Sequence, residues 1–224
     1  SETCALDIIG AKFVRDIENG EIISIEQNHI QSFKPFKKYN QRPCIFERIY
    51  FASPDSLVGN KTVYTYRKAL GEQLAIENEL SADVVVPIPD SGVSAAIGFS
   101  QKSKIPFELG IIRSHYVGRT FIEPSQTIRQ FGVKLKHSVN RSCIHNKRVI
   151  LIDDSIVRGT TANKIVKMVY EAGAKEVHLG ISCPPILHPD FYGIDTPNYN
   201  QLIASNSNLD KITKLVGVKS LFFL

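Results

Sequence analysis

The sequence has no apolar run of the roughly 20 residues that a helix needs to cross a bilayer. The apolar tail at 220–224 is far too short for this purpose. The first residues, Ser1-Glu2-Thr3-Cys4, also lack the basic start and apolar stretch of a secretory signal peptide. We therefore expect a cytoplasmic protein with no membrane partner.

Cysteine is scarce and is not arranged in any metal-binding pattern. Neither a CxxC pair nor a cysteine–histidine pair at zinc spacing occurs among Cys4, Cys44, Cys143 and Cys183. In a cytoplasmic protein such residues are expected to be free thiols. An initiator methionine is missing as well, and the start at Ser1 suggests a processed chain or a piece of a longer one.

Internal repeats and low-complexity tracts are absent, and the composition is that of a globular protein. The chain has 224 residues, of which 43% are hydrophobic and 22% charged. This length is enough for one large domain, or for one domain and a fragment of another.

The net charge of +5 is concentrated in one region of the sequence. Between residues 113 and 148 the sequence has a single acid, Glu123. The basic residues in this region are Arg113, Arg119, Arg129, Lys134, Lys136, Arg141, Lys147 and Arg148. No aromatic platform or fold signature for nucleic acid accompanies them, so no nucleic-acid partner is expected. The pattern favours a polyanionic small molecule, and a solvated basic loop is the alternative.

Segments with strand and helix patterns alternate along the chain. Strands are predicted at 44–51, 82–88, 107–112, 149–152 and 176–183, and helices at 65–78, 93–100 and 162–172, with one or two short helices between 202 and 216. A short hairpin or a sheet edge is predicted within residues 1–30 and a polar linker at 31–43. This order predicts an α/β fold with a parallel sheet and right-handed crossovers.

Residues 114–140 show no clear period, and loops of this length are usually functional. The segment contains basic residues together with Phe121 and Ile122, which are poor residues for a permanently solvated loop. We expect a flexible loop that closes over a polyanion and excludes water. A disordered basic loop is the alternative.

The most informative run is Val-Ile-Leu-Ile-Asp-Asp-Ser-Ile-Val-Arg-Gly-Thr-Thr at 149–161. A buried strand leads directly into Asp153 and Asp154, and a glycine-containing turn then leads into a helix. The turn amides and the helix start can bind a phosphate, while the carboxylates can bind ribose hydroxyls or a hydrated Mg²⁺. An ordinary capped turn needs neither two adjacent acids nor the Arg-Gly-Thr-Thr sequence.

A second turn with similar features is Pro89-Asp90-Ser91-Gly92, which also follows a strand and precedes a helix. In a parallel sheet both turns lie at the same edge, where ligands bind. On its own this turn is equally well explained as a plain connection. Together the two turns suggest a ligand that carries phosphates at both ends.

The run at 149–161 resembles the phosphoribosyl-diphosphate (PRPP) motif of type I phosphoribosyltransferases. More narrowly, the chain is similar to the glutamine PRPP amidotransferase (amidophosphoribosyltransferase) family over nearly its whole length. The other segments that carry this resemblance are 1–7, 44–47, 50–52, 54–56, 87–91, 116–122 and 171–177. Of these, 50–52 and 116–122 are specific to the amidotransferases.

The resemblance implies a type I phosphoribosyltransferase fold with a flexible loop and a short N-terminal β remnant of a glutaminase domain. It places the remnant and linker at 1–40 and the phosphoribosyltransferase domain at 41–224. It implies substrate binding by Asp90, Ser91, Gly92, Asp153, Asp154, Ser155, Val157, Arg158, Gly159, Thr160 and Thr161. Ser91, Asp153 and Asp154 would hold Mg²⁺, and Arg113 and Lys136 would act on the departing diphosphate.

The implied reaction replaces the diphosphate at C1 of PRPP by ammonia and gives 5-phosphoribosylamine, the first step of purine biosynthesis. Most of the glutaminase domain is missing and Cys4 is not a terminal nucleophile, so glutamine would require a separate glutaminase chain. The resemblance also implies a homo-oligomer and inhibition by purine nucleotides. No iron–sulfur cluster is expected, because Cys44 matches one cluster position whereas Asp190 stands at another.

Two other functions remain open at this point. A purine-salvage phosphoribosyltransferase would need a base-stacking aromatic residue and a hood, which Pro184-Pro185-Ile186 does not clearly supply. A non-catalytic remnant that binds PRPP or nucleotides would retain the same acids and threonines.

Overall fold

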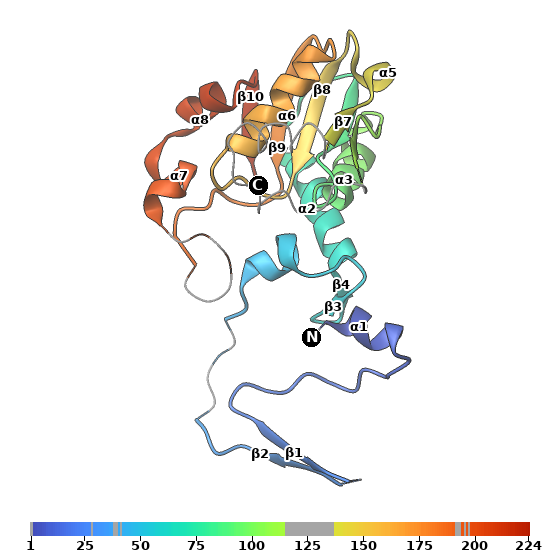
Figure 1. The fold of residues 1–224 in the computed structure, drawn as a ribbon, viewed down its shortest axis with the longest axis vertical. Coiled ribbons are helices and arrows are strands. Elements are labelled where there is room, and N and C mark those ends of the chain that lie inside the picture. The colour runs from blue at the N-terminus through green and yellow to red at the C-terminus, as the bar shows by residue number, and fades with distance from the viewer. Residues whose placement is uncertain are drawn as a thin grey trace. The chain divides into compact units, whose positions relative to one another are not determined.

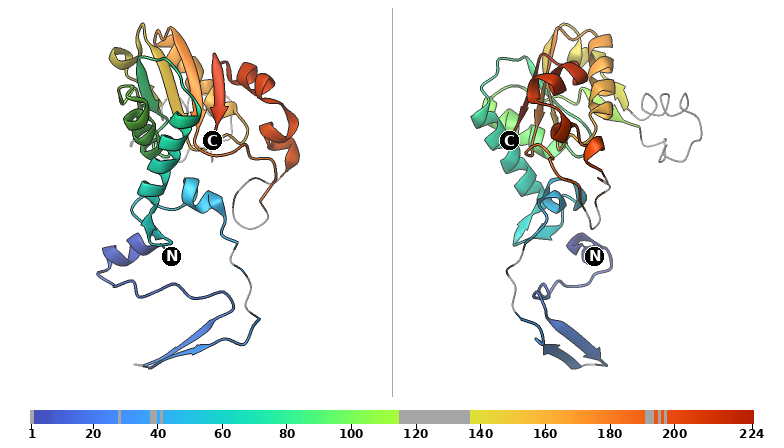
Figure 2. Two further views of the ribbon diagram at one scale, coloured as in Figure 1. Left: turned by 180° about the vertical axis from the view of Figure 1, so that it is seen from behind. Right: turned by 90° about the vertical axis from the view of Figure 1, so that its left-hand side faces the viewer.

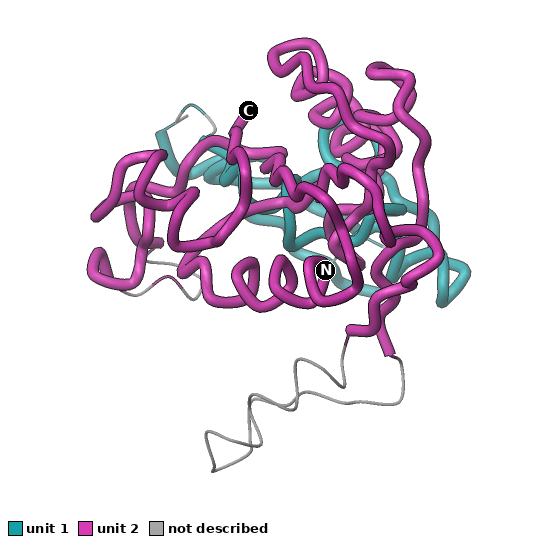
Figure 3. Tube along the Cα trace, turned by 90° about the horizontal axis from the view of Figure 1, so that it is seen from above, with its two compact units in different colours: residues 1–63 teal, residues 64–224 magenta. Residues whose placement is uncertain are grey.

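The computed structural model describes residues 2–27, 29–37, 40, 42–114, 137–190, 194, 196 and 198–224 (Figure 1). These residues form two compact units, 1–63 and 64–224 (Figure 3). The domain boundary predicted at residue 40, which separates segments assigned to two different domain families, stays a prediction. None of the helices in the described ranges has the length and apolar character needed to span a bilayer.

The first unit is built from short elements. In chain order they are α1 (Thr3–Ile8), β1 (Ile22–Glu26), β2 (His29–Phe33), η1 (Glu47–Phe51), β3 (Leu57–Val58) and β4 (Lys61–Thr62). Strands β1 and β2 pair antiparallel and form the predicted hairpin (Figure 2). Because β2 extends to Phe33, the predicted linker begins later than residue 31.

The strand predicted at 44–51 is wrong, because this segment is helical and contains the π-helical turn η1. Phe46 and Tyr50, four residues apart, bring their ring centroids within 5.6 Å of each other. Ile49 is buried whereas Ile45 is exposed. The aromatic and β-branched content predicts a strand, but contacts at helical spacing decide the conformation here.

The second unit is centred on a parallel sheet of four strands in the order β10-β9-β8-β5. The strands are β5 (Val84–Pro87), β8 (Arg148–Asp153), β9 (Glu176–Ile181) and β10 (Ser220–Phe223). The main helices are α2 (Val63–Glu77), α3 (Val93–Ser103), α6 (Thr160–Glu171) and α8 (Leu209–Val216), with short α5 (Arg141–Ile144), η3 (Tyr199–Gln201) and α7 (Ile203–Asn206). The predicted α/β parallel fold is confirmed, with helices on both faces of the sheet (Figure 2).

Helices α2 and α3 pack together against one face of the sheet, and two glycines permit their close approach. A Cβ atom on Gly71 would lie 1.8 Å from the carbonyl oxygen of Ala95. A Cβ atom on Gly98 would lie 1.9 Å from the carbonyl oxygen of Lys68. Any larger residue at either position would therefore force the two helices apart.

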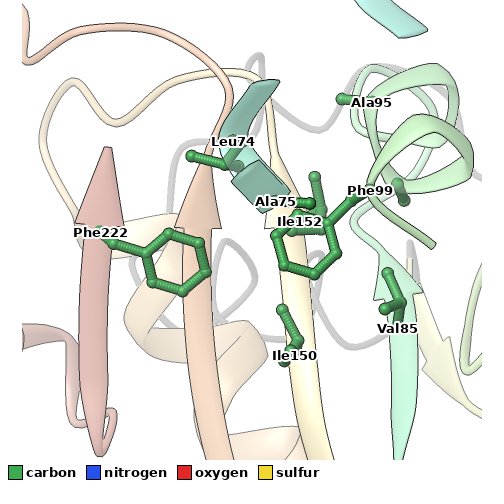
Figure 4. Close-up of a cluster of buried hydrophobic side chains, with 9 residues drawn as sticks. Leu74, Ala75, Val85, Ala95, Phe99, Ile150, Ile152 and Phe222 are labelled. Atoms are coloured by element: carbon green, nitrogen blue, oxygen red, sulfur yellow. The ribbon is translucent and has the colours of Figure 1, made fainter. Parts of the chain in front are cut away.

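The core on this face contains Leu74 and Ala75 of α2, Ala95, Ala96 and Phe99 of α3, and Val85, Ile150, Ile152 and Phe222 of the sheet (Figure 4). The Phe222 side chain extends over Gly180 of the neighbouring strand, where an added Cβ would lie 2.6 Å from the ring. The side-chain alternation of a strand places Val149 and Leu151 on the opposite face, which α6 covers.

Strand β10 is missing from the elements predicted from sequence. Its residues Ser220-Leu221-Phe222-Phe223 pair parallel with β9 from His178 to Ile181. The segment is short and carries no flanking signal. Only the tertiary contact with β9 makes it a strand.

A small antiparallel pair flanks the sheet, formed by β6 (Ile111–Arg113) and β7 (His137–Val139). The predicted strand at 107–112 is thus shorter, and Phe107 makes only an isolated parallel bridge with Val85. The loop predicted at 114–140 ends in β7, and its residues 115–136 lie outside the described residues.

Candidate functional site

The carboxyl ends of β5 and β8 bring the two predicted turns together at one edge of the sheet. Pro87 and Ile152 are register partners, so the turns begin at the same level. The Ile88 amide donates to the Ile152 carbonyl oxygen at 2.8 Å and extends this pairing. Ligands of open α/β sheets bind at such an edge.

The first turn lies tightly against the end of β8. The Gly92 amide donates to the Ile88 carbonyl oxygen at 3.0 Å, and α3 begins at the following residue. A Cβ atom on Gly92 would lie 2.3 Å from the Ile152 carbonyl oxygen. Glycine is therefore required at this position for the turn to approach the neighbouring strand.

The paired carboxylates lie at the end of β8, where Asp154 is only 5% exposed. The Asp154 amide donates to Asp153 Oδ1 at 2.9 Å. Burial, and then the neighbouring Asp154 charge, raise the pKa of Asp153 well above its ordinary value. A hydrogen bond from the Ser91 side chain to Asp153 lowers the pKa of Asp153. This bond also connects the two turns.

Residues 155–161 form the turn between β8 and α6. Gly159 precedes the helix with a φ of +74°, a conformation that favours glycine. No side chain caps this helix start, and Thr160 and Thr161 are exposed on its first turn. The first amides of an α-helix have no partner within the helix, so the uncapped start of α6 can bind an anion.

The remaining residues of this turn have partners within the protein. The Ser155 hydroxyl donates to Asp154 Oδ2 at 2.7 Å and is therefore hydrogen-bonded to the carboxylate pair. The Val157 carbonyl oxygen accepts from the Ile203 amide at 2.9 Å. Arg158 Nε donates to Gln201 Oε1 at 2.8 Å.

Arg113, at the end of β6, forms an ion pair with Asp90 of the first turn. Both side chains are exposed, so the pair can open when an anion competes for the guanidinium. The structure thus brings Arg113 to the predicted site. Lys136, the other predicted catalytic residue, lies outside the described residues.

Two residues that follow β9 also lie at this edge and were not predicted from sequence. The Ser182 amide donates to the Asp153 carbonyl oxygen at 3.0 Å. Burial, and then the charges of Asp154 and Asp153, raise the pKa of the Cys183 thiol to about 12. Their position directly after a buried strand is the signal that could have identified them.

The donor atoms at the site suit a hard divalent cation. Asp153 and Asp154 supply carboxylate oxygens, and Ser91 supplies a hydroxyl. Mg²⁺ prefers oxygen ligands and is often held by one or two carboxylates together with substrate phosphates. Burial, and then the Asp154 charge, raise the pKa of Asp153, and a bound cation would oppose both effects by stabilising the ionised carboxylate.

Comparisons with known proteins agree with this geometry. Residues 68–190 match the phosphoribosyl transferase domain family. An amidophosphoribosyltransferase of Rhizobium etli is 59% identical over 230 residues, covering 100% of this chain and 46% of the relative. One of Bacillus subtilis is 49% identical over 224 residues, covering 100% of this chain and 47% of the relative.

Among solved structures, glutamine PRPP amidotransferase from Bacillus subtilis, complexed with ADP and GMP, superposes with a TM-score of 0.92 at 48% identity. The match covers 100% of this chain and 49% of that chain. The chain thus spans about half the length of the relatives it matches. It belongs to the phosphoribosyltransferase family, and the relatives that it matches along its whole length are amidophosphoribosyltransferases.

Proposed function

We propose that the chain carries the phosphoribosyl-transfer half of an amidophosphoribosyltransferase. It would bind PRPP, replace the diphosphate at C1 by ammonia and release 5-phosphoribosylamine. The observation that carries this proposal is the Asp153–Asp154 pair, which lies between the uncapped start of α6 and the turn at 90–92. This arrangement fits a ribose with phosphate groups at both ends.

Each part of the site would bind one part of PRPP. The amides and hydroxyls at Thr160 and Thr161 would hold the 5′-phosphate. Asp153 and Asp154 would accept hydrogen bonds from the ribose hydroxyls. The turn at 90–92 would present the Asp90 and Ser91 amides to the diphosphate, since the Gly92 amide donates to the Ile88 carbonyl oxygen. Substrate would thereby be held in one orientation, which lowers the entropic part of the barrier.

The chemical step creates positive charge at C1 and negative charge on the departing diphosphate. The Asp153–Asp154 pair would lie beside the developing cation and stabilise it. Arg113 would leave Asp90 and transfer its charge to the diphosphate. Mg²⁺ held by the two aspartates and Ser91 would supply further positive charge to the leaving group.

Release of diphosphate from PRPP and Mg²⁺ tests this proposal, with ammonium chloride or glutamine as the nitrogen donor. We expect release with ammonium chloride and none with glutamine alone. Asp154→Asn should abolish release, whereas Asp210→Asn, an exposed control on α8, should retain it. A chain that binds PRPP but releases no diphosphate with either donor would contradict the proposal.

A second candidate function is nucleotide binding at the same site without turnover. It is favoured by one observation, that the related Bacillus subtilis structure is complexed with ADP and GMP. The two functions are separated by calorimetry with GMP and with PRPP, together with the diphosphate assay. A non-catalytic protein would bind both ligands and release no diphosphate. Salvage of purine bases receives no support from the amidophosphoribosyltransferase relatives.

We also propose that residues 1–40 are the C-terminal part of a glutaminase domain. The hairpin β1–β2 supports this, because it has apolar side chains on both of its faces. Ile25 and Ile30 are paired on one face and are 70% and 68% exposed, and Ile22 and Phe33 are paired on the other. Two exposed apolar faces are typical of a strand pair that belongs inside a larger sheet structure.

This second proposal is tested by adding the part of the Rhizobium etli relative that lies outside the match. We expect the two polypeptides to associate and diphosphate release to become dependent on glutamine. Ile25→Lys should weaken the association, whereas Ser24→Lys should affect it less, since Ser24 lies on the other face. Glutamine-dependent release by the chain alone would overturn this assignment.

A further inference from the structure

Arg158, in the turn between β8 and α6, is held by a residue that lies 43 positions later in the chain. Its Nε and Nη2 groups both donate to the side-chain carbonyl oxygen Oε1 of Gln201, with Nε at 2.8 Å. Gln201 is the last residue of η3. Neither hydrogen bond uses the Nη1 donors of the guanidinium, so these can bind another acceptor.

The short turn that carries Gln201 is itself fixed in place. Leu202, the next residue, is completely buried. The Asn206 side-chain amide donates to the carbonyl oxygens of Tyr199 at 2.7 Å and of Leu202 at 3.0 Å. Gln201 is exposed, but the backbone that presents it is anchored on both sides.

This anchored segment also contacts the backbone of the turn at 155–161. The Ile203 amide donates to the Val157 carbonyl oxygen at 2.9 Å. A Cβ atom on Gly159 would lie 2.8 Å from the Ile203 side chain, so the two segments are in close contact. Helix α7 lies beside α8, and α8 in turn lies beside β10 at the edge of the sheet (Figure 1).

Helix α6 is connected to the same C-terminal region from its own first turns. The Asn163 side-chain amide donates to the carbonyl oxygens of Leu215 at 2.8 Å and of Val216 at 3.1 Å, at the end of α8. The helix start, the turn before it and the Arg158 side chain are therefore all held by residues 199–217.

We propose that Gln201 is a positioning residue for the 5′-phosphate of PRPP, acting through Arg158. A neutral acceptor orients the guanidinium without compensating its charge, so the full positive charge remains available to the phosphate. The two hydrogen bonds to Gln201 also restrict the Arg158 side chain to fewer rotamers before substrate binds, which lowers the entropic cost of binding. This inference rests on the proposed function.

The test compares Gln201→Leu, Gln201→Glu and the control Asn200→Leu, which changes an exposed amide on the same turn. Binding of PRPP and of inorganic diphosphate is measured by calorimetry with Mg²⁺, and KM and kcat by diphosphate release. Gln201→Leu should weaken PRPP binding and raise KM about tenfold, with a smaller change in kcat, because an Arg158 that is no longer oriented would lose about one charge-assisted hydrogen bond to the phosphate.

Inorganic diphosphate provides the specific control, because it has no 5′-phosphate and should bind all variants with equal affinity. Gln201→Glu retains an acceptor oxygen for both donors but places a negative charge beside the guanidinium, so its PRPP affinity should exceed that of Gln201→Leu and fall below that of the original protein. The double variant R158A/Q201L should bind PRPP no more weakly than Arg158→Ala alone, because the glutamine acts only through the arginine.

Original PRPP affinity in Gln201→Leu would overturn the inference. An equal loss of PRPP and diphosphate binding would also overturn it, because that result indicates general disruption of the site. If Gln201→Leu does not fold, the inference is judged on Gln201→Ala and Gln201→Glu against Arg158→Ala by the same measurements. Failure of the original protein to bind PRPP would overturn the proposed function instead, so the two outcomes are distinguishable.

Discussion

Asp83 and Arg148 join β5 and β8 at the edge of the sheet opposite the candidate site. Asp83 Oδ1 lies 2.7 Å from Arg148 Nη2, and Asp83 Oδ2 accepts from the Arg148 amide at 2.8 Å. The side-chain and then the backbone hydrogen bonds from Arg148 lower the pKa of Asp83 to about 2 from an ordinary value of 3.8.

This pair predicts a specific acid sensitivity. Because the pKa of Asp83 is lower in the folded protein than in the unfolded chain, its stabilising effect is complete above about pH 4 and is lost as the pH falls toward 2. Asp83→Asn should therefore flatten the decline of stability between pH 4 and pH 2. Urea unfolding at several pH values measures this, and Glu79→Gln, an exposed carboxylate nearby, should leave the decline unchanged.

The Asp153–Asp154 pair predicts the reverse effect on the ligand-free protein. The pKa of Asp153 is raised in the folded state, so at neutral pH its ionised form destabilises the fold. Asp153→Asn should therefore raise the melting temperature of the ligand-free protein, because it removes the buried negative charge. It should also abolish the further increase that Mg²⁺ and PRPP give to the original protein.

Differential scanning calorimetry with and without ligand checks both parts of that prediction. Asp210→Asn, an exposed aspartate on α8, serves as the control and should respond to ligand like the original protein. A lower melting temperature for ligand-free Asp153→Asn would show that the pair does not repel in the way proposed.

The contact between α2 and α3 predicts that Gly71→Ala destabilises the protein by about 2 kcal/mol or more. The new Cβ atom would lie 1.8 Å from a backbone oxygen, which cannot move without shifting α3. Equilibrium unfolding in urea measures the loss. Gln73→Ala, at an exposed position of the same helix, should change stability by less than about 0.5 kcal/mol.

The cysteines should differ in reactivity toward a thiol reagent. Cys44 is exposed, whereas Cys183 is buried and has a pKa of about 12. At pH 8 we expect Cys44 to be modified within minutes and Cys183 only after unfolding in denaturant. Peptide mass spectrometry identifies the modified residues, and Cys44→Ser provides the matched control. Rapid labelling of Cys183 in the folded protein would contradict the structure.

Several features of the fold follow from local sequence. The apolar run at 149–152 predicts a buried strand and the structure confirms β8. The segments around 65–78, 93–100 and 162–172 are helices with small shifts of their ends. These predictions are correct because periodic apolar residues and glycine turns act over a few residues, independently of distant contacts.

The site was predictable to the extent that both turns begin where buried parallel strands end. Because the carboxyl ends of parallel strands meet at one edge, Asp90, Ser91, Asp153 and Asp154 are expected there, and the structure places them at that edge. The ion pair between Asp90 and Arg113 has no such signal, because it depends on how β6 folds back toward the first turn.

The sequence by itself determined the parallel α/β class, the acidic strand end and the glycine turn before α6, because each depends on neighbouring residues. Tertiary structure alone decided that 220–223 becomes a strand and that Gln201 reaches Arg158. Those outcomes depend on contacts between residues far apart in the chain. Their free energies are set by packing and by hydrogen bonds that exist only once the sheet and its helices have assembled.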